Sequence, residues 1–320
     1  MGDAPRDVED LAAERASRRA AKDFAAADAL RDRIAQRGWT VVDEAEGWRL
    51  EPIAAAVVPS GPVAAHDVAS VLDEPATADA SIHWVVEGWP QDVLRAIDSF
   101  RENRGDRDIH YVVADVTGEP AATWGDDVEV VELERGTGWG AARNAGLKRS
   151  RGRIVLAMDG SVEATGDVLG PLQDTLADPT VGVCGPFGIV TPDLREFDST
   201  DGPEADAIEG YCMAFRREVL TTAGLFDEKF RWYRTADIEY SFRIKHLGLR
   251  AVVVPVPLER HEHRMWFQTT PADRARWSKR NFYRFLDRWR DRYDLTVSGE
   301  PPSGHDHHEH GGHEEHHHGP

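Results

Sequence analysis

The spacing of apolar residues changes from one part of the chain to the next, and each spacing predicts a different element. In residues 9–37 apolar positions recur every three or four residues, which is the period of an amphipathic helix. Gly38 then favours a helix stop. Residues 40–43 and 48–51 predict two short strands, with a turn at Glu46 and Gly47. We therefore expect residues 1–52 to form a small N-terminal helical hairpin module, made of a helical segment plus a short β-hairpin.

Residues 53–80 differ from both neighbouring segments in composition. They are rich in alanine, valine and proline, and Pro59, Pro62 and Pro75 interrupt any regular element. This composition predicts a linker, with a short helix near residues 67–72.

Residues 81–298 alternate between two kinds of pattern. Short apolar runs at 82–86, 109–113, 128–133, 154–158 and 251–254 predict strands, and the segments 90–103, 140–148 and 273–293 predict helices. Such alternation is typical of an α/β domain with a mostly parallel sheet. Ligands of these sheets bind outside the carboxyl ends of the strands. Glu87, Asp115 and Asp159 stand at the ends of three predicted strands, so we expect the site there.

Residues 299–320 form a low-complexity segment that carries eight of the fourteen histidines. Its acidic, glycine- and histidine-rich composition lacks the apolar residues of a packed core, so we expect a disordered His-rich tail. Imidazole nitrogens bind Ni²⁺ and Zn²⁺, which makes metal capture by this tail a second expectation.

The composition restricts the compartment and the partners of the protein. A chain of 320 residues with 41% apolar residues has room for one large domain and a small one. A net charge of -19 repels nucleic acid at long range. Two cysteines, Cys184 and Cys212, make no disulfide framework. No apolar run reaches the roughly 18 residues of a transmembrane helix, and the start of the chain does not resemble a signal peptide. These features favour a cytoplasmic protein.

Two acidic sites carry the candidate chemistry. Residues 138–146 form a glycine-rich turn that leads into a helix, and the strand 154–158 ends at Asp159. An anion-binding helix start near a strand-end carboxylate suits a phosphorylated, metal-bridged ligand. The second site is the acidic segment around Asp237. The alternatives are structural: Asp159 as a turn carboxylate, and Thr235 or Asp237 as a helix N-cap.

The order of these segments resembles the family 2 glycosyltransferases, whose fold is glycosyltransferase A. Residues 138–146 match the Gly-x-x-x-Ala-Arg-Asn-x-Gly segment of that family, Asp159-Gly160-Ser161 stands at its Asp-x-Asp motif, and Asp237 stands in its catalytic-base segment. The resemblance implies an inverting transferase for a nucleotide-diphosphate sugar, with Asp237 as the catalytic residue. Donor binding is then expected from four residues at the strand ends and in the glycine-rich helix: Glu87, Asp115, Arg143 and Asp159.

The same resemblance implies a divalent metal, Mg²⁺ or Mn²⁺. Asp159 and Ser161 occupy the metal motif, and Ser161 offers only a neutral oxygen where the family has a second carboxylate, so we expect weaker metal binding. A histidine near the following strand completes the metal shell in related enzymes. His261 and His263 are the candidates here, with surface histidines as the alternative.

The acceptor implied by the resemblance is a carbohydrate or a glycolipid. Trp232 and Tyr233 precede the candidate base, and aromatic rings suit sugar faces, although packing in the core is the commoner use of such residues. The altered metal motif and the replacement of the family's Pro-x-Tyr-Asn turn by residues 87–90 leave a second hypothesis open. It is a non-catalytic glycosyltransferase-like binding module.

The N-terminal module resembles the C-terminal end of cysteinyl-tRNA synthetases. The similarity covers about forty residues, including Arg15, Arg18, Lys22-Asp23-Phe24 and Gly38-Trp39, and no nucleotide-binding or zinc motif of a synthetase is present. Aminoacylation is therefore not implied. We interpret the segment as a helical hairpin used for packing or partner contact. A tRNA- or translation-linked adaptor is the third hypothesis, and the acidic net charge argues against it.

Overall fold

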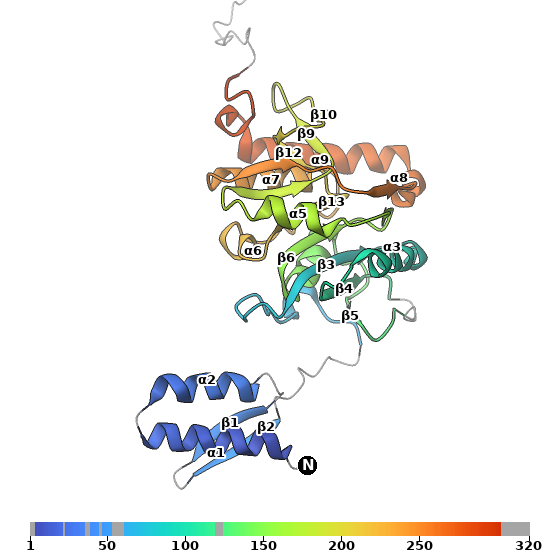
Figure 1. Cartoon of the computed structure of the whole chain (residues 1–320). Coiled ribbons are helices and arrows are strands. Elements are labelled where there is room, and N and C mark those ends of the chain that lie inside the picture. Colours follow the sequence, from blue (N-terminus) through green and yellow to red (C-terminus); the bar gives the residue numbers. More distant parts are fainter. Residues whose placement is uncertain are drawn as a thin grey trace, which may run out of the picture. The chain divides into compact units, whose positions relative to one another are not determined.

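The protein divides into two compact units, Met1–Gly61 and Pro62–Pro320. The structure, a computed structural model, describes residues 4–21, 23–35, 39–44, 47–52, 61–118 and 124–301 (Figure 1). The expected His-rich tail, from residue 302 on, and residues 53–60 of the expected linker lie outside the described residues. Within the described part of the chain, no helix combines the length and the apolar character that crossing a bilayer requires.

The N-terminal unit contains two helices where one continuous helical run was expected. Its elements are α1 (Arg6–Ala20), α2 (Phe24–Ala35), β1 (Trp39–Glu44) and β2 (Gly47–Pro52). The break falls at Asp23, whose carboxylate accepts a hydrogen bond from the Ala26 backbone N–H at 3.3 Å and so caps a new helix. The two strands pair antiparallel, as predicted. The small core of this unit consists of Val8, Leu11, Ala12, Leu30, Ile34 and Val41.

Arg15 fastens the helices of this unit to its hairpin. The side chain is only 5% exposed, and its two terminal nitrogens bond both oxygens of Asp43 at 2.8 and 3.1 Å. Arg19 pairs with the same carboxylate. The hydrogen bond to Arg15 lowers the pKa of Asp43 against the effect of burial. Arg15 and Arg19 are therefore paired within the unit.

The larger unit is built on an eight-stranded mixed sheet. The strand order is β11-β14-β8-β13-β6-β3-β4-β5, in which β5, β4, β3 and β6 run parallel and β13 runs antiparallel to β6 and β8. The strands are β3 (Ala78–Val86), β4 (Ile109–Asp115), β5 (Val128–Glu132), β6 (Gly152–Met158), β8 (Val181–Gly185), β11 (Glu204–Ala205), β13 (Cys212–Arg216) and β14 (Arg250–Val253).

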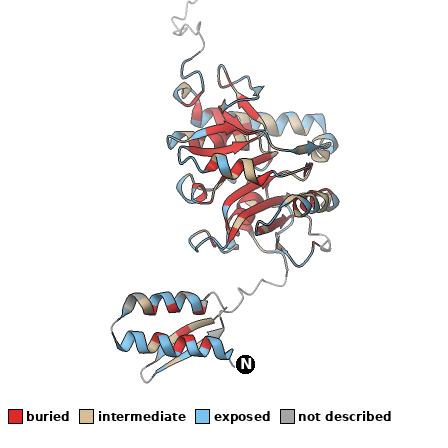
Figure 2. Cartoon of the chain, in the orientation of Figure 1, coloured by how far each residue is buried: buried red, intermediate tan, exposed pale blue. Residues whose placement is uncertain are grey.

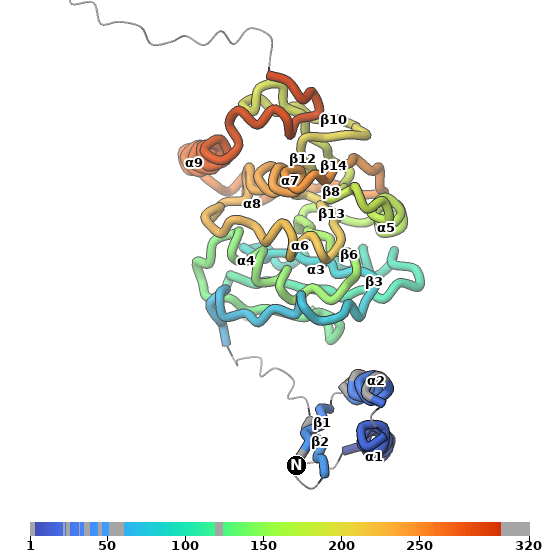
Figure 3. The backbone as a smooth tube through the Cα atoms, turned by 90° about the vertical axis from the view of Figure 1, so that its left-hand side faces the viewer, coloured from blue at the N-terminus to red at the C-terminus, as the bar shows by residue number. Residues whose placement is uncertain are grey.

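Helices cover both faces of this sheet, and together they give an α/β sandwich of three layers (Figures 1 and 3). One face packs against α3 (Pro90–Asn103) and α5 (Leu169–Leu176). The other packs against α4 (Trp139–Leu147), α6 (Val219–Thr222) and α7 (Ala236–His246). Figure 2 shows buried residues concentrated in the strands and exposed residues on the outer sides of the helices. The predicted α/β fold with a mostly parallel sheet is confirmed.

Shorter elements complete the large unit around this sandwich. A three-stranded sheet joins β9 (Gly188–Val190) to β10 (Asp198–Thr200) and β12 (Ala207–Ile208). A two-stranded ladder joins β7 (Val162–Ala164) to β15 (Leu258–Arg260). The chain then forms α8 (Arg264–Gln268) and α9 (Pro271–Trp289), with 3₁₀ turns at Ala65–Asp67 and Tyr293–Leu295. Helix α9 packs on α7 through Phe285 and Trp289, which contact Phe242.

Residues 62–77 were expected to be part of a linker, but they belong to the large unit. The Val63 backbone N–H donates to Glu132 O at 2.9 Å, and the Val71 N–H donates to Lys148 O at 2.8 Å. The side chains of Ala65 and Val71 are buried. The prolines end regular structure here, yet the apolar residues between them find partners on β5 and α4, which the local composition does not reveal.

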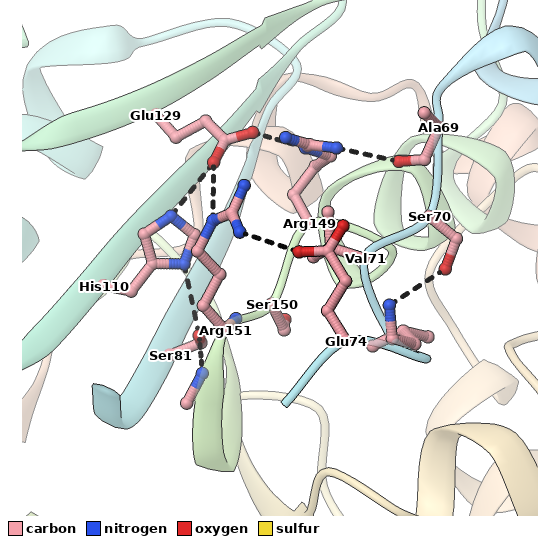
Figure 4. A network of polar contacts seen from close by, with 12 residues as sticks. Ala69, Ser70, Val71, Glu74, Ser81, His110, Glu129, Arg149, Ser150 and Arg151 are labelled. Atoms are coloured by element: carbon pink, nitrogen blue, oxygen red, sulfur yellow. Dashed lines mark hydrogen bonds and ion pairs between the residues drawn. The ribbon is translucent and has the colours of Figure 1, made fainter. Parts of the chain in front are cut away.

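An ionic network ties the same segment to the sheet (Figure 4). Glu129 on β5 pairs with Arg149 and lies 3.0 Å from His110 Nε2 on β4. Arg149 also donates to Ala69 O at 3.0 Å, and Arg151 lies 3.3 Å from Glu74. Burial opposes ionisation of Glu129, but its hydrogen bonds to His110 and Arg149 lower its pKa. The carboxylate is therefore charged at neutral pH and holds residues 69–74 in place.

We expect Gly146→Ala to destabilise the protein. A Cβ atom at this position of α4 would lie 1.6 Å from Nε2 of the buried His83, whose other ring nitrogen contacts Arg143 at 2.8 Å. The gain in helix propensity is only about 1 kcal/mol, whereas overpacking of a core costs about 1–3 kcal/mol or more. The free energy of unfolding from urea titration should fall by about 2 kcal/mol.

A double-mutant cycle provides the control for this prediction. Because His83→Ala removes the ring that meets the new methyl group, the two substitutions together should cost less than the sum of the single changes. Full additivity would show that the close approach of α4 and β3 is not the cause.

Candidate active site

The site lies where four elements of the large unit meet at one edge of the sheet. The parallel strands β3 and β6 end at this edge, so Glu87 and Asp159 leave the sheet side by side. Strand β13 runs the other way, which places residues 209–211 at its start beside the end of β6. The Asp159 N–H donates to Tyr211 O at 3.1 Å and closes this junction. The first turn of α7 adds Asp237.

The two acids chosen from the sequence line one cavity. The main cavity has a volume of about 490 Å³, and its lining includes Asp159, Asp237 and His263. A smaller side cavity of about 60 Å³ adjoins it and contains Glu87 and Ser161. Asp159, His263, Arg143, Trp139 and Tyr233 line both. Asp159 and Asp237, which are 78 positions apart in the chain, therefore line the same cavity.

Asp159 is the polar centre of the site. Its Oδ1 accepts hydrogen bonds from the Ser161 backbone N–H at 2.8 Å and from Ser161 Oγ at 2.5 Å. Its Oδ2 lies 3.0 Å from Nε2 of His263. Burial opposes the charge on Asp159, but the contacts with His263 and Ser161 lower its pKa. For His263, burial likewise opposes the charge, and the bond to Asp159 raises the pKa. The two side chains therefore pair with each other, and metal binding would displace the proton of His263, because only a neutral imidazole ligates a metal.

The two candidate histidines follow the β15–β7 ladder and contact different acids. Arg260 on β15 pairs with Val162 on β7, and the His261 N–H donates to Ser161 O at 2.8 Å, so the next residues run beside the end of β6. His263 then turns to Asp159. His261 instead places Nε2 2.7 Å from Oε1 of Glu163 and does not line either cavity. Of the four predicted metal ligands, Ser161 and His263 both contact Asp159, whereas His261 contacts Glu163.

This set is small for a metal site. In the part of the chain that the structure describes, no group of three or more His, Cys, Asp or Glu residues lies close enough to hold a metal ion. One carboxylate, one imidazole and one hydroxyl do converge at Asp159. Mg²⁺ and similar ions commonly use one or two carboxylates together with waters and substrate phosphates. The donor set thus fits a metal that is shared with a diphosphate.

Asp237 occupies the first turn of α7 and has a raised pKa. Burial is the main cause, opposed by hydrogen bonds from the Gly210 N–H at 2.8 Å and the Ile238 N–H at 2.9 Å. The N-cap residue is Thr235, with no capping bond from its side chain and a left-handed φ of 71°. Such backbone is costly for a β-branched residue and concentrates at functional sites. Asp237 is therefore not the N-cap that its position also permitted.

Glu209 and Tyr211 belong to residues 209–216, which resemble the acceptor-side block of the family 2 glycosyltransferases, and both line the main cavity. Arg234 lines it as well, and the sequence interpretation named no function for it. Burial raises the pKa of Glu209, and the charge of Asp237 adds to the rise. Arg260 lies 3.7 Å from the centre of the Tyr211 ring and 3.7 Å from the Glu209 carboxylate. The antiparallel direction of β13 brings this segment beside Asp159.

Arg143 and Asn144 brace the site. Arg143 donates to His83 O at 2.9 Å and to Met158 O at 3.0 Å, which links the ends of β3 and β6. Its burial lowers the pKa of its guanidinium to about 10. Asn144 exchanges hydrogen bonds with the Phe226 backbone at 2.8 and 2.9 Å. Arg143 also lines both cavities, so its predicted contact with a donor stays a prediction.

The two remaining acids at the strand ends differ in their surroundings. Burial raises the pKa of Glu87 to about 7, and the nearby charge of Asp159 contributes to the rise while Arg143 opposes it. Asp115, at the end of β4, accepts hydrogen bonds from the Thr117 N–H at 2.8 Å and Thr117 Oγ1 at 2.7 Å. It lines neither of the two cavities.

The two aromatic residues predicted for the acceptor point to different places. Tyr233 lines the main cavity, where its ring centre lies 4.7 Å from that of His263. Trp232 is 7% exposed and packs against Trp277, with ring centres 5.0 Å apart. Of the two, only Tyr233 is placed to meet a ligand in the main cavity.

The site lies at the carboxyl ends of the strands β3 and β6, where α/β sheets of this kind bind their ligands. Residues 87–240 match the family model for glycosyl transferase family 2. These residues form a family 2 glycosyltransferase domain, which is the class of enzyme that the sequence predicts.

The fold is similar to that of a solved structure. The structure described as GalNAc-T7 with UDP, GalNAc and Mn²⁺ is 17% identical, with a TM-score of 0.56, and the match covers 68% of this chain and 49% of that one. A mannosyltransferase from Pyrobaculum calidifontis in complex with GDP-Man and Mn²⁺ is 22% identical with a TM-score of 0.46, covering 59% and 57%. The chain thus spans about half the length of these proteins. The first likeness supports the glycosyltransferase A fold.

The N-terminal module is similar to part of a synthetase. A cysteine–tRNA ligase from Opitutus terrae is 50% identical over 48 residues, which is 15% of this chain and 10% of the ligase. The match is therefore confined to a short segment, as the sequence resemblance indicated.

We expect His83 to make stability depend on pH. Its complete burial, together with the charge of Arg143, lowers its pKa well below the ordinary value of about 6.5. Protonation therefore favours the unfolded chain, so stability is full above about pH 6.5 and declines as the pH falls, by up to about 1.4 kcal/mol per pH unit. His263, with its raised pKa, acts in the opposite direction. Urea titrations of the wild type and His83→Gln should show a shallower acid decline in the variant; equal slopes would contradict the assignment.

Proposed function

We propose that the protein is an inverting glycosyltransferase that moves a sugar from a nucleotide-diphosphate donor to a hydroxyl group of a carbohydrate or glycolipid. The supporting observation is that Asp159, with His263 beside it, and Asp237 line one cavity of about 490 Å³. The first group suits a diphosphate and the second suits a hydroxyl that must lose a proton. The UDP and GDP-mannose in the similar structures support a nucleotide sugar as the donor.

Asp159 and His263 are the residues that would hold a divalent metal, with Ser161 as a neutral third contact. The side chains of Asp159 and His263 already contact each other, because Asp159 Oδ2 and His263 Nε2 lie 3.0 Å apart. A bound Mg²⁺ or Mn²⁺ supplies Lewis-acid stabilisation of the leaving diphosphate. The Mn²⁺ in both similar structures supports such an ion. Arg143, buried behind Asp159, adds fixed positive charge on the same side.

Asp237 is the proposed general base. Each of its carboxylate oxygens accepts one backbone hydrogen bond, which orients the group and leaves lone pairs free for a proton. The acceptor oxygen attacks the anomeric carbon, the bond from that carbon to the diphosphate oxygen breaks, and the hydroxyl proton passes to Asp237. A single displacement of this kind inverts the anomeric carbon. Burial raises the pKa of Asp237 and so makes its carboxylate a better proton acceptor.

Tyr233 and Glu209 are the proposed acceptor-side contacts. Both line the main cavity with Asp237. The Tyr233 ring offers an apolar face to a sugar, and the Glu209 carboxylate accepts hydrogen bonds from hydroxyl groups.

Removal of the base should abolish transfer and leave the donor bound. Asp237→Asn keeps the shape of the side chain but cannot take a proton, so we expect kcat to fall by about 10²–10⁴-fold. In the wild type, activity should be present above the pKa of Asp237 and lost as the pH falls through it, and this loss occurs at a higher pH than for an ordinary aspartate. The hydrolysis rates of a panel of UDP-sugars, measured by pH-stat kinetics, test both the loss of kcat and the pH dependence.

Full turnover by the Asp237→Asn variant would reject Asp237 as the base. Donor binding without any turnover in the wild type would favour the binding-module hypothesis.

The two histidines provide a matched test of the metal assignment. His263→Ala and Asp159→Asn should each weaken Mn²⁺-dependent UDP binding by tenfold or more. Substitution of a metal ligand, or of a residue that supports one, commonly lowers metal affinity by about 10–100-fold. His261→Ala should leave this binding unchanged, since His261 contacts Glu163 instead. Calorimetric titration of UDP with and without Mn²⁺ measures the difference. Equal losses in both histidine variants would overturn the assignment.

A further inference from the structure

A third cavity in the large unit contains a cluster of positive charge. This basic cavity has a volume of about 270 Å³ and shares no lining residue with the main cavity. Its size is close to the lower end of the range for small-ligand pockets, about 300–1,000 Å³, so it suits a ligand of one or two rings. Its lining consists of Gly136, Thr137, Gly138, Lys229, Arg231, Trp232, Trp277, Arg280 and Asn281.

The three cations of the basic cavity have no acidic partner. In the described residues, no carboxylate lies within ion-pairing distance of Lys229, Arg231 or Arg280, and none lines the cavity. Two neighbouring arginines of α9 are paired instead: Arg276 with Asp273, and Arg284 with Asp227. Lys229, Arg231 and Arg280 are exposed, so they give this hollow a positive potential that suits an anionic ligand.

The donors of this cavity are partly held in place before any ligand arrives. The Arg231 side chain donates to Gly136 O at 2.7 Å, which fixes its guanidinium at the cavity wall. The first amides of α4 are already bonded, because the Trp139 and Gly140 N–H groups donate to Arg231 O and Phe230 O. The anion would therefore be held by side chains and not by the end of this helix.

Trp232 lines the basic cavity and carries an unpartnered hydrogen-bond donor, as Trp84, Trp124 and Trp289 do elsewhere in the described residues. It is 7% exposed, and its Nε1–H has no hydrogen-bond partner among the residues that the structure describes. A buried N–H without a partner costs free energy, which an acceptor oxygen of a ligand would recover. Trp277 lies beside it, with the ring centres 5.0 Å apart. Indole rings suit the apolar faces of sugars.

We propose that the basic cavity binds an anionic sugar, with its phosphate or carboxylate on Arg231, Arg280 and Lys229 and its ring against Trp232 and Trp277. Guanidinium groups bind such anions through paired, charge-assisted hydrogen bonds. The sugar reaches the site either as a free sugar phosphate or as one residue of an anionic glycan. This site is separate from the donor site, and the inference does not rest on the proposed transfer reaction. Because Tyr233 follows Trp232 and lines the main cavity, the two sites share one wall.

Calorimetric titration of the full chain tests this site. The probes are inorganic phosphate, glucose 6-phosphate and tetragalacturonate, with glucose as the neutral control and EDTA present. We expect saturable binding of at least one anionic probe and none of glucose. Arg280→Gln and Arg231→Gln should each weaken that binding by about tenfold or more, since each removes a charge-assisted contact. Binding of glucose 6-phosphate supports a free ligand, and binding of tetragalacturonate alone supports a glycan; either outcome supports the site.

Arg290→Gln is the matched control. It removes one positive charge from the region just after α9, where Arg290 is exposed and pairs with Asp287, and it should leave probe binding unchanged. The proposal is overturned if no anionic probe binds, if the Arg280 and Arg231 variants bind as the wild type does, or if UDP with Mn²⁺ displaces the probe. Thermal melting of each variant verifies folding. Hydrolysis of UDP-sugars by Arg280→Gln reports separately on the donor site, so failure of one proposal is distinguishable from failure of the other.

Discussion

The contact of Arg143 with the ends of β3 and β6 is the constraint on which the site depends. Its buried guanidinium donates to His83 O on one strand and to Met158 O on the other. Parallel strands alone bring Glu87 and Asp159 to the same edge, but backbone carbonyls at strand ends need donors. The arginine supplies these donors from α4, and Asn144 next to it holds the Phe226 segment. One helix turn thereby fixes the floor of both cavities.

Reversed strands bring the remaining functional groups to this floor. Strand β13 runs antiparallel between β6 and β8, so the residues before it meet Asp159. The β15–β7 ladder does the same for His263, about a hundred positions later in the chain. One side of the resulting cavity carries the paired Asp159 and His263, and the other carries Asp237 and Glu209, whose pKa values are raised. In the proposed reaction, the first pair would meet the leaving diphosphate and the second the acceptor hydroxyl.

Much of the fold and part of the candidate site follow from local pattern. The expected helix at residues 90–103 has the observed bounds, and the apolar runs predict β3, β4, β5 and β6 to within a few residues. Asp159 and Asp237 were chosen from their segments and do line one cavity. The helix break at Asp23 and the packing of residues 62–77 were missed, because a cap and a few apolar contacts decide them. The acceptor-side resemblance of residues 209–216 was visible in the sequence, but their place beside Asp159 depends on the direction of β13.

The sequence by itself determined the α/β class, the strand ends with their acids and the candidate base, because these depend on spacing along a few residues. Only the tertiary structure decided which histidine reaches Asp159 and that Trp232 and Tyr233 face different cavities. It also decided which lysine and arginine side chains have no carboxylate within ion-pairing distance. Consecutive residues such as Trp232 and Tyr233 can face different cavities, because one step along a strand or turn reverses the direction of the side chain. The partner that each side chain meets then comes from a distant segment, which no local pattern specifies.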